Sequence, residues 1–193
     1  MFENSKKKEY PIEDIEVIQL NESTLKYTLG FECNIDELEK FLTEDALNQT
    51  NQSINRTFLW ISKTNKILLS YITICVDAIS LDSILKEEMQ KAGIKYKSLP
   101  ALKICRMAVR KELTKKGIGK RMISFAINQA IKVHKESAYR FITLDAKNDE
   151  KTPEHLKPIR FYKKLEFEEL KRRKKDNTIH LFLDLINYTN PKN

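Results

Sequence analysis

The chain has 193 residues, with 35 Lys or Arg against 27 Asp or Glu, which gives a formal charge of +8 and a pI near 9.2. This length suffices for one domain with a substantial core, so we take residues 1–193 as a single domain that starts with a flexible segment over residues 1–10. No stretch approaches the roughly twenty apolar residues of a membrane span. No apolar segment follows the basic residues Lys6 to Lys8, as a secretory signal would require. We therefore expect a cytoplasmic protein that does not associate with a membrane.

The excess positive charge is concentrated in two segments, 111–121 and 160–175. A solvated surface is one interpretation of such runs. A polyanionic partner, either the phosphates of a cofactor or a nucleic acid, is the alternative.

The three cysteines, Cys33, Cys75 and Cys105, lie far apart in the sequence among apolar or strand-like neighbours. Their number is odd and no paired spacing indicates zinc, so we expect neither a disulfide framework nor a metal site. We interpret all three as buried free thiols.

The apolar periodicity predicts alternating strands and helices. The first half reads as a strand, an amphipathic helix with Asn34 as its N-cap, two strands, and a short helix, over residues 12–20, 34–47, 57–63, 66–76 and 80–92. A turn at Gly93 and a loop lead to Pro100. The second half reads as a buried strand, a helix, a second buried strand, a helix after Pro158 and a closing hairpin, over residues 101–109, 117–131, 140–146, 158–165, 167–170 and 178–185. This order predicts a mixed α/β layer fold.

The most informative stretch runs from Ala101 to Arg121 and reads as a buried strand, a basic turn with glycines and the start of a helix. Backbone N–H groups at a helix start lack intrahelical partners, and the helix dipole favours negative charge there. Gly117 and Gly119 remove side chains where a backbone approaches a ligand. The spacing matches neither a Walker A motif nor a dinucleotide fingerprint. Taken alone, the loop is equally well interpreted as an ordinary β-to-α turn.

A second motif, FYKKLEF, follows about forty residues later and spans Phe161 to Phe167. With the element order, the two motifs resemble the GNAT superfamily of acyl-CoA-dependent N-acetyltransferases, from about residue 31 to residue 185. That family carries R/Q-x-x-G-x-G/A in its loop, where this chain matches both glycines but has Thr114 in place of Arg or Gln. The second family signature, F-Y-x-x-x-G-F, is matched except that Glu166 replaces the glycine. Glycine there usually adopts a positive φ after a helix, so Glu166 would cost about 1 kcal/mol if that angle is kept.

The resemblance implies the GNAT fold, an α/β fold whose mixed, mostly antiparallel sheet has splayed central strands and flanking helices. It also implies acetyl-CoA as co-substrate, no metal, and a pantetheine arm lying between the splayed strands. Backbone contacts and an oxyanion donor would come from the central strand, and the pyrophosphate would bind the loop. The implied cofactor-binding residues are Met107, Ala108, Val109, Lys115, Lys116, Gly117, Ile118, Gly119, Lys120 and Phe161.

The resemblance also implies that Tyr162 is the general acid that protonates the departing thiolate. A core tyrosine capping the helix is the alternative. No residue stands out as a general base: we interpret Asp145 as a turn residue and His134 as a core histidine, with His155 in a connector and His180 on a closing strand. We therefore expect a water-relayed proton or an amine that is already partly neutral.

Two further segments resemble the toxin-like branch of the family. FECNIDELEKFLTEDAL matches its N-terminal pattern, and ALKICRMAV matches its strand motif, at positions Phe31, Cys33, Leu38, Phe41, Leu42, Ala46 and Arg106. Members of that branch with assigned function acetylate the amino group of aminoacyl-tRNA. Aminoacyl esters have unusually acidic α-ammonium groups, which suits a site without a strong base. The two basic segments would then hold the tRNA backbone.

Two other functions stay open. In the first, the chain acetylates a small amine or a protein N-terminus. Polyamines are cations and would need an acidic pocket, for which the candidates are Asp77, Asp82, Glu87 and Glu88. In the second, the chain is a non-catalytic RNA-binding module with a GNAT fold, an alternative supported by Thr114 and Glu166. A homodimer and an antitoxin partner also stay open.

Overall fold

The computed structural model describes residues 12–133, 136–148, 158–170 and 178–189. The N-terminal segment predicted to be flexible, His134, His155 and the basic run over 171–175 lie outside the described residues.

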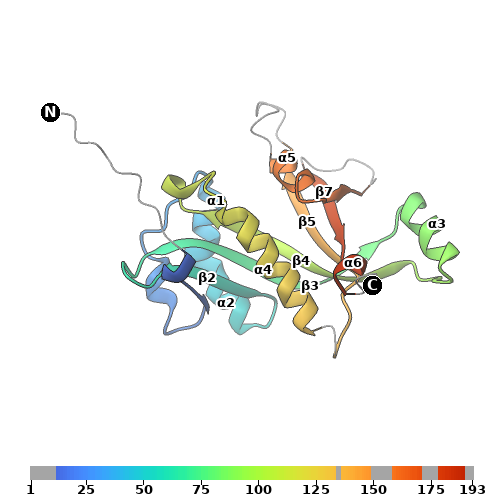
Figure 1. Ribbon diagram of the computed structural model, residues 1–193. Coiled ribbons are helices and arrows are strands. Elements are labelled where there is room, and N and C mark those ends of the chain that lie inside the picture. Colours follow the sequence, from blue (N-terminus) through green and yellow to red (C-terminus); the bar gives the residue numbers. More distant parts are fainter. Residues whose placement is uncertain (1–11, 134–135, 149–157, 171–177, 190–193) are drawn as a thin grey trace.

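One seven-stranded sheet, in the order β1-β2-β3-β4-β5-β7-β6, organises the molecule (Figure 1). Its strands are β1 Ile15–Gln19, β2 Arg56–Ser62, β3 Leu68–Ser80, β4 Ser98–Val109, β5 Phe141–Lys147, β6 Glu168–Glu169 and β7 Thr178–Asp184. Every neighbouring pair is antiparallel except β4 and β5, which run parallel. The predicted mixed, mostly antiparallel sheet is therefore confirmed.

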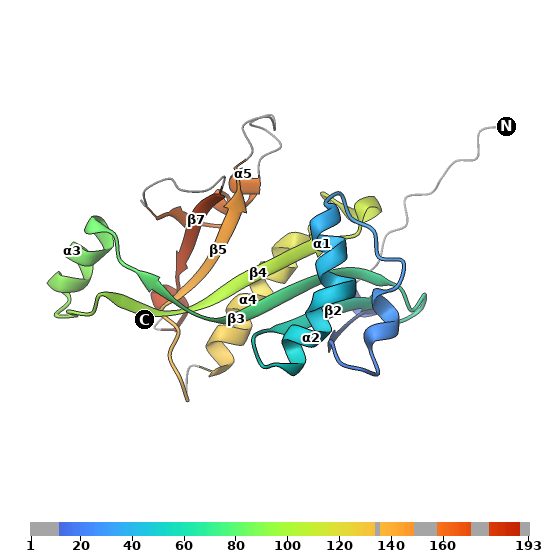
Figure 2. The ribbon, with the colours of Figure 1, turned by 180° about the vertical axis from the view of Figure 1, so that it is seen from behind.

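Helices cover both faces of this sheet. They are α1 Asp36–Lys40, α2 Ala46–Asn51, α3 Ser83–Lys91, α4 Ile118–Val133, α5 Pro158–Lys163 and α6 Ile186–Thr189, with 3-10 turns η1 Ile12–Asp14, η2 Leu25–Thr28 and η4 Lys111–Leu113 and a π-helical turn η3 Phe41–Asp45. Figure 2 shows α1 and α2 in front of the sheet with α4 behind it. Within the described residues, no helix is both long and apolar enough to cross a membrane.

Buried apolar side chains form three clusters on the two faces of the sheet. The stripe of α4, including Met122, Ile123 and Ala126, packs against Leu102 and Ile104 of β4 and forms the largest one. The opposite face is closed by the first helix, whose Phe41 and Leu42 are buried against the fully buried Tyr71. Alternate residues of a strand point to opposite faces, so β4 contributes to all three clusters, the third through Leu99 and Ala101.

The central strands separate halfway along the sheet. β4 pairs with β5 only over Ala101–Ile104 and Phe141–Leu144, whereas it pairs with β3 along its whole length. The β3–β4 register shifts between Thr73 and Ile74, which leaves Cys105 as an extra residue on β4. Such a bulge bends a strand and increases its twist. Beyond it, β4 and β5 diverge, as Figures 1 and 2 both show, and the predicted splay is confirmed.

The start of the first helix differs from the prediction. The N-cap position is occupied by Ile35, without a side-chain cap, instead of Asn34. The Glu39 carboxylate accepts a hydrogen bond from the Cys33 N–H at 2.6 Å. A side chain of the helix therefore satisfies a backbone donor that precedes the helix. The helix then widens into the π-turn η3, just after Leu38, whose carbonyl accepts the Tyr71 hydroxyl at 2.7 Å. A side chain that bonds into the helical ladder is a known cause of such an irregularity.

Two cysteines that are far apart in the sequence meet at the bulge. Cys75 and Cys105 lie on adjacent strands with their Sγ atoms 3.1 Å apart, and both thiols are free and half-buried instead of fully buried. The Cys105 thiol donates to Cys75 Sγ and holds the pKa of Cys75 below its usual value. A thiolate attacks more readily than a thiol, and a disulfide would bring the two sulfurs only about 1 Å closer.

We expect diamide to close the Cys75–Cys105 disulfide in the folded protein, because the sulfurs are already in contact. The oxidised chain should be lighter by about 2 Da, and the linked peptides should be found by mass spectrometry. Cys33→Ser should still form this bond and Cys75→Ser should not. A mixed disulfide to Cys33, or no mass change, would contradict the prediction.

Candidate active site

Beyond Ile104, the backbone N–H groups on the β5 side of β4 have no partner in β5. The Arg110 N–H donates to Leu69 O of the β3 side at 2.9 Å. Because the direction of N–H groups alternates along a strand, those of Met107 and Val109 point the other way, into the gap, while that of Ala108 points toward β3. Two of the three predicted strand residues therefore offer donors there. Such donors suit an extended ligand arm or a developing oxyanion.

At one end of the gap, the basic loop leads directly into α4, which begins at Ile118. Two residues of the loop have positive φ angles, Lys115 at +61° and Gly117 at +82°. Backbone N–H groups at the start of a helix lack intrahelical partners and favour an anion. The predicted pyrophosphate loop therefore lies at the N-terminus of a sixteen-residue helix.

The side chains of this loop have different roles. Lys115, Lys116 and Lys120 are exposed, while Ile118 is buried in the core, so only its backbone is available to a ligand. The Thr114 hydroxyl, which replaces the family's Arg or Gln, donates to the Lys111 carbonyl at 3.1 Å. Thr114 therefore stabilises the turn.

Gly119 is required by close packing and not by an unusual φ. A Cβ at this position would lie 3.1 Å from Cζ of Phe161, tighter than ordinary van der Waals contact. Phe161 belongs to α5, so the missing side chain lets α5 rest on the first turn of α4. The glycine of the first motif thus contacts the aromatic residue of the second.

Tyr162 stands beside this contact. Its ring is flanked edge-on by Phe161 and Phe167, with centroids 5.1 and 5.7 Å away. Burial raises the pKa of Tyr162 to about 12, so the hydroxyl keeps its proton at neutral pH. No hydrogen bond from the described residues reaches that hydroxyl. The proton is therefore available to a ligand, as a general acid requires.

Glu166 adopts the conformation expected of the family's glycine. Its φ is +66°, just beyond the end of α5, where the Phe167 N–H donates to the Tyr162 carbonyl at 3.2 Å. The left-handed angle costs about 1 kcal/mol for a residue with a Cβ. Glu166 thus keeps the turn between α5 and Phe167 that a glycine would form.

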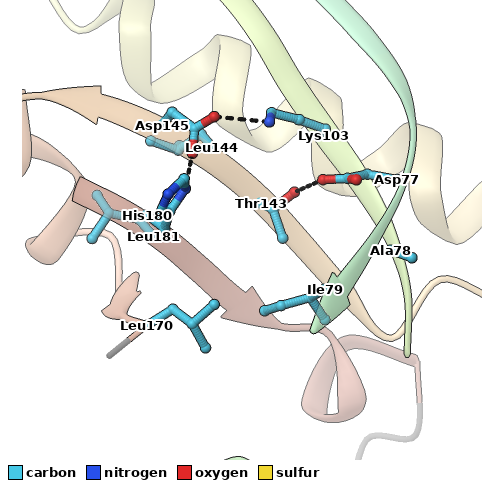
Figure 3. A pocket seen from close by; sticks show the side chains of 10 residues that line it. All are labelled: Asp77, Ala78, Ile79, Lys103, Thr143, Leu144, Asp145, Leu170, His180 and Leu181. Atoms are coloured by element: carbon cyan, nitrogen blue, oxygen red, sulfur yellow. Dashed lines mark hydrogen bonds and ion pairs between the residues drawn. The ribbon is translucent and has the colours of Figure 1, made fainter. Parts of the chain in front are cut away.

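The opposite face of the sheet carries a polar pocket of about 100 Å³ that the sequence did not indicate (Figure 3). Asp145 lies inside β5 and is not a turn residue as predicted. One of its oxygens pairs with Lys103 Nζ of β4 at 2.8 Å, and the other contacts Nδ1 of His180 of β7. Nearby, the Thr143 hydroxyl donates to Asp77 of β3 at 3.1 Å. The β5–β7 register places Asp145 opposite His180, and this register could not be read from the sequence.

The acidic pocket considered for polyamines is not assembled. Of its four candidates, only Asp77 lines the polar pocket. Asp82 caps α3 by accepting the N–H groups of Ile84 and Leu85, and Glu87 pairs with Lys91 at 2.8 Å. Across the described ranges, no group of three or more His, Cys, Asp and Glu side chains could hold a metal ion.

We expect the Lys103–Asp145 pair to stabilise the fold only while both groups are charged. Burial alone would raise the pKa of Asp145, but the hydrogen bonds and charges of Lys103 and, to a smaller extent, His180 outweigh it and hold that pKa below its usual value. Burial lowers the pKa of Lys103, and Asp145 more than reverses this, so the net pKa is raised. The stabilisation is therefore present from above about pH 4 to about pH 10.4 and is lost outside that window.

Urea unfolding of wild type and Asp145→Asn checks this prediction. The difference in unfolding free energy should be about 1 kcal/mol at pH 7 and should vanish as the pH falls below 4. A difference that stays constant down to pH 3 would contradict it.

Comparison with known proteins agrees with this geometry. The family model of the acetyltransferase (GNAT) domain matches residues 72–169, about half of the chain. No curated protein sequence matches. Among solved structures, AtaT complexed with acetyl-methionyl-tRNAfMet is similar, with a TM-score of 0.74 and 23% identity over 91% of this chain and 97% of that one.

Two other structures share the fold. A Tyr-to-Phe mutant of KacT has a TM-score of 0.71 and 19% identity, covering 89% of this chain and 95% of that one. AtaTR bound with acetyl-CoA has a TM-score of 0.69 and 23% identity, covering 90% and 95%. The matched segment contains the splayed strands, the basic loop before α4 and the Tyr162 motif, and the chain belongs to the GNAT acetyltransferase family.

Proposed function

We propose that this protein transfers the acetyl group of acetyl-CoA to the α-amino group of an aminoacyl-tRNA. The observation that carries the proposal is the gap between β4 and β5, with the basic loop at the start of α4 at one end and a protonated tyrosine beside it. An elongated thioester with a pyrophosphate at its far end has the shape and charge that such a site accepts.

The chain supplies three of the chemical requirements of acetyl transfer. The N–H groups of Met107 and Val109 hold the pantetheine arm and the thioester oxygen, where negative charge develops. The loop from Lys115 to Lys120 binds the pyrophosphate through backbone N–H groups and lysine charges. Tyr162 donates its proton to the departing sulfur, which would otherwise leave as a thiolate.

A tRNA acceptor is supported by the basic residues of the surface and by the structural similarity to AtaT. The exposed basic residues Lys120 and Arg121 of α4 and Arg160 of α5 lie next in sequence to Gly119 and Phe161, the two residues through which these helices pack together. Clustered lysines and arginines suit the phosphate backbone of a nucleic acid. The similar AtaT was solved with acetyl-methionyl-tRNAfMet. AtaT was also solved with the C-terminus of the antitoxin AtaR, and we include an antitoxin among the proposed partners.

Release of CoA from acetyl-CoA, followed with a thiol reagent, tests the proposal. The acceptors are bulk charged tRNA, the same tRNA after deacylation, and a panel of small amines that includes methionine methyl ester. Release with charged tRNA but not with deacylated tRNA is expected. Release with a small amine alone would keep the acetyltransferase and reject the tRNA acceptor. Saturable acetyl-CoA binding without any release would favour the non-catalytic module.

A further inference from the structure

The polar pocket contains a histidine held in one orientation by a carboxylate. His180 Nδ1 contacts Asp145 Oδ1, and Asp145 Oδ2 is held by Lys103 Nζ at 2.8 Å (Figure 3). No hydrogen bond from the described residues reaches Nε2 of His180, and the His180 side chain is 33% exposed. A carboxylate on Nδ1 directs the lone pair to Nε2, the arrangement in which histidine takes protons from substrates.

This pair lies at the point where the strands separate. Ile104 and Leu144 form the last pair of β4 with β5, and Asp145 is the next residue along β5. Asp145 therefore stands at the closed end of the gap that is proposed to hold the thioester. Lys103 lies directly before that last pair and reaches across from β4.

The pair faces the side of the sheet opposite to Tyr162. The neighbours of Asp145 and His180 along their strands, such as Leu144 and Leu181, pack in the α4 cluster, as does Tyr162. Alternation along the strands turns Asp145 and His180 to the other face. Tyr162 and the His180–Asp145 pair thus lie on opposite faces of the sheet. This arrangement suits acetyl transfer, because the attacking amine and the departing sulfur occupy different directions around the carbonyl carbon.

The charges of the pocket suit an ammonium ion. Asp77 and Asp145 carry two negative charges against the single positive charge of Lys103, in a chain whose formal charge is +8. An amine arrives mostly as its ammonium form and has to lose a proton before it attacks. Asp77 attracts the cation, while Lys103 is kept at Asp145 by the ion pair.

We propose that His180 is the catalytic residue that takes the proton of the acceptor amine, and that Asp145 is its positioning residue. This inference rests on the proposed acetyl transfer. Nε2 of His180 removes one proton from the ammonium, and the nitrogen lone pair then forms the bond to the thioester carbon. As the C–S bond breaks, the sulfur takes the Tyr162 proton. The amide nitrogen loses its remaining extra proton to water, and His180 and Tyr162 return to their starting forms by proton exchange with solvent.

The test compares acetyl transfer by wild type, His180→Ala and Asp145→Asn to charged tRNA and to methionine methyl ester, a small probe amine. Asp184→Asn is the matched control, because Asp184 is a carboxylate of β7 paired with Arg140 at 2.7 Å and is similarly exposed, at 29% against 32% for Asp145. We expect kcat to fall about 100-fold or more in His180→Ala, with acetyl-CoA affinity unchanged. Added imidazole should restore part of the rate, because it replaces the missing proton acceptor. Imidazole would not restore a rate that was lost through a structural defect. Asp184→Asn should keep wild-type kcat.

The positioning role of Asp145 is tested by NMR, in a measurement that does not depend on acetyl transfer. In ¹⁵N NMR spectra, His180 of the wild type should show the form protonated on Nδ1 alone, and Asp145→Asn should show a mixture of tautomers. A single unchanged tautomer in Asp145→Asn would overturn the positioning role.

The remaining outcomes separate the two proposals. If wild type acetylates charged tRNA and His180→Ala does so within threefold, the inference fails and the proposed function stands. If wild type acetylates only the ester, the tRNA acceptor fails, and the His180→Ala rate on the ester still decides the inference. Loss of rate in His180→Ala without imidazole rescue would overturn the catalytic role. Absence of turnover with both acceptors would overturn both proposals.

Discussion

Replacement of Tyr162 by Phe should lower kcat for acetyl transfer by about 100- to 10,000-fold, the usual contribution of a positioned proton donor. The substitution removes only the hydroxyl, which no described residue bonds, and it keeps the ring contacts with Phe161 and Phe167. The free energy of unfolding and the affinity for acetyl-CoA should therefore change little. Steady-state kinetics, calorimetric acetyl-CoA binding and urea unfolding measure the three quantities.

Tyr96→Phe is the matched control, because Tyr96 is 72% exposed and lies between α3 and β4. Its kcat should equal that of the wild type. If Tyr162→Phe kept its kcat while losing stability, Tyr162 would be a core residue that caps its helix, the alternative drawn from the sequence.

Gly119→Val should lower turnover about 100-fold by displacing α5 from the start of α4. Even the first carbon of a side chain would lie 3.1 Å from the Phe161 ring, and valine adds two more carbons in the same space. Phe161 contacts Tyr162 edge-on, so a shift of Phe161 moves the proton donor, and a misplacement of about 1 Å costs on the order of 100-fold in rate. Overpacking should also cost about 1–3 kcal/mol of stability.

A second substitution makes this prediction specific. In the double variant Gly119→Val/Phe161→Leu, leucine is smaller than phenylalanine and leaves room for the valine side chain, so part of the turnover should return. Gly93→Val serves as control, because Gly93 has a positive φ and a Cβ added there would meet no atom within 4 Å. It should lose stability through backbone strain but keep acetyl-CoA affinity. Full activity in Gly119→Val would show that α5 is not seated through this contact.

The predicted strands and main helices agree with the structure in type and order, because local patterns specify them, although α6 was not predicted and the first helix is interrupted by the π-turn η3. The α4 stripe of Met122, Ile123 and Ala126 has helical spacing, and β5 has a continuous apolar run. Strand ends were less predictable. β4 begins at Ser98 and includes Pro100, which was expected to end a loop. Pro100 is tolerated because β5 pairs with β4 only from Ala101 onward, so β4 is an edge strand there.

By itself, the sequence determined the resemblance to the GNAT family, the basic glycine loop before a helix and the helical position of Tyr162, because the motifs behind each consist of residues close together in the chain. Gly117, Gly119, Phe161 and Tyr162 belong to two short motifs with fixed spacing. Only the tertiary structure decided which distant side chains meet. The Cys75–Cys105 contact depends on a one-residue bulge, and the His180–Asp145 pair depends on the β5–β7 register. Strand register is set by packing of the whole sheet, and a shift of one residue would turn each of these side chains to the opposite face.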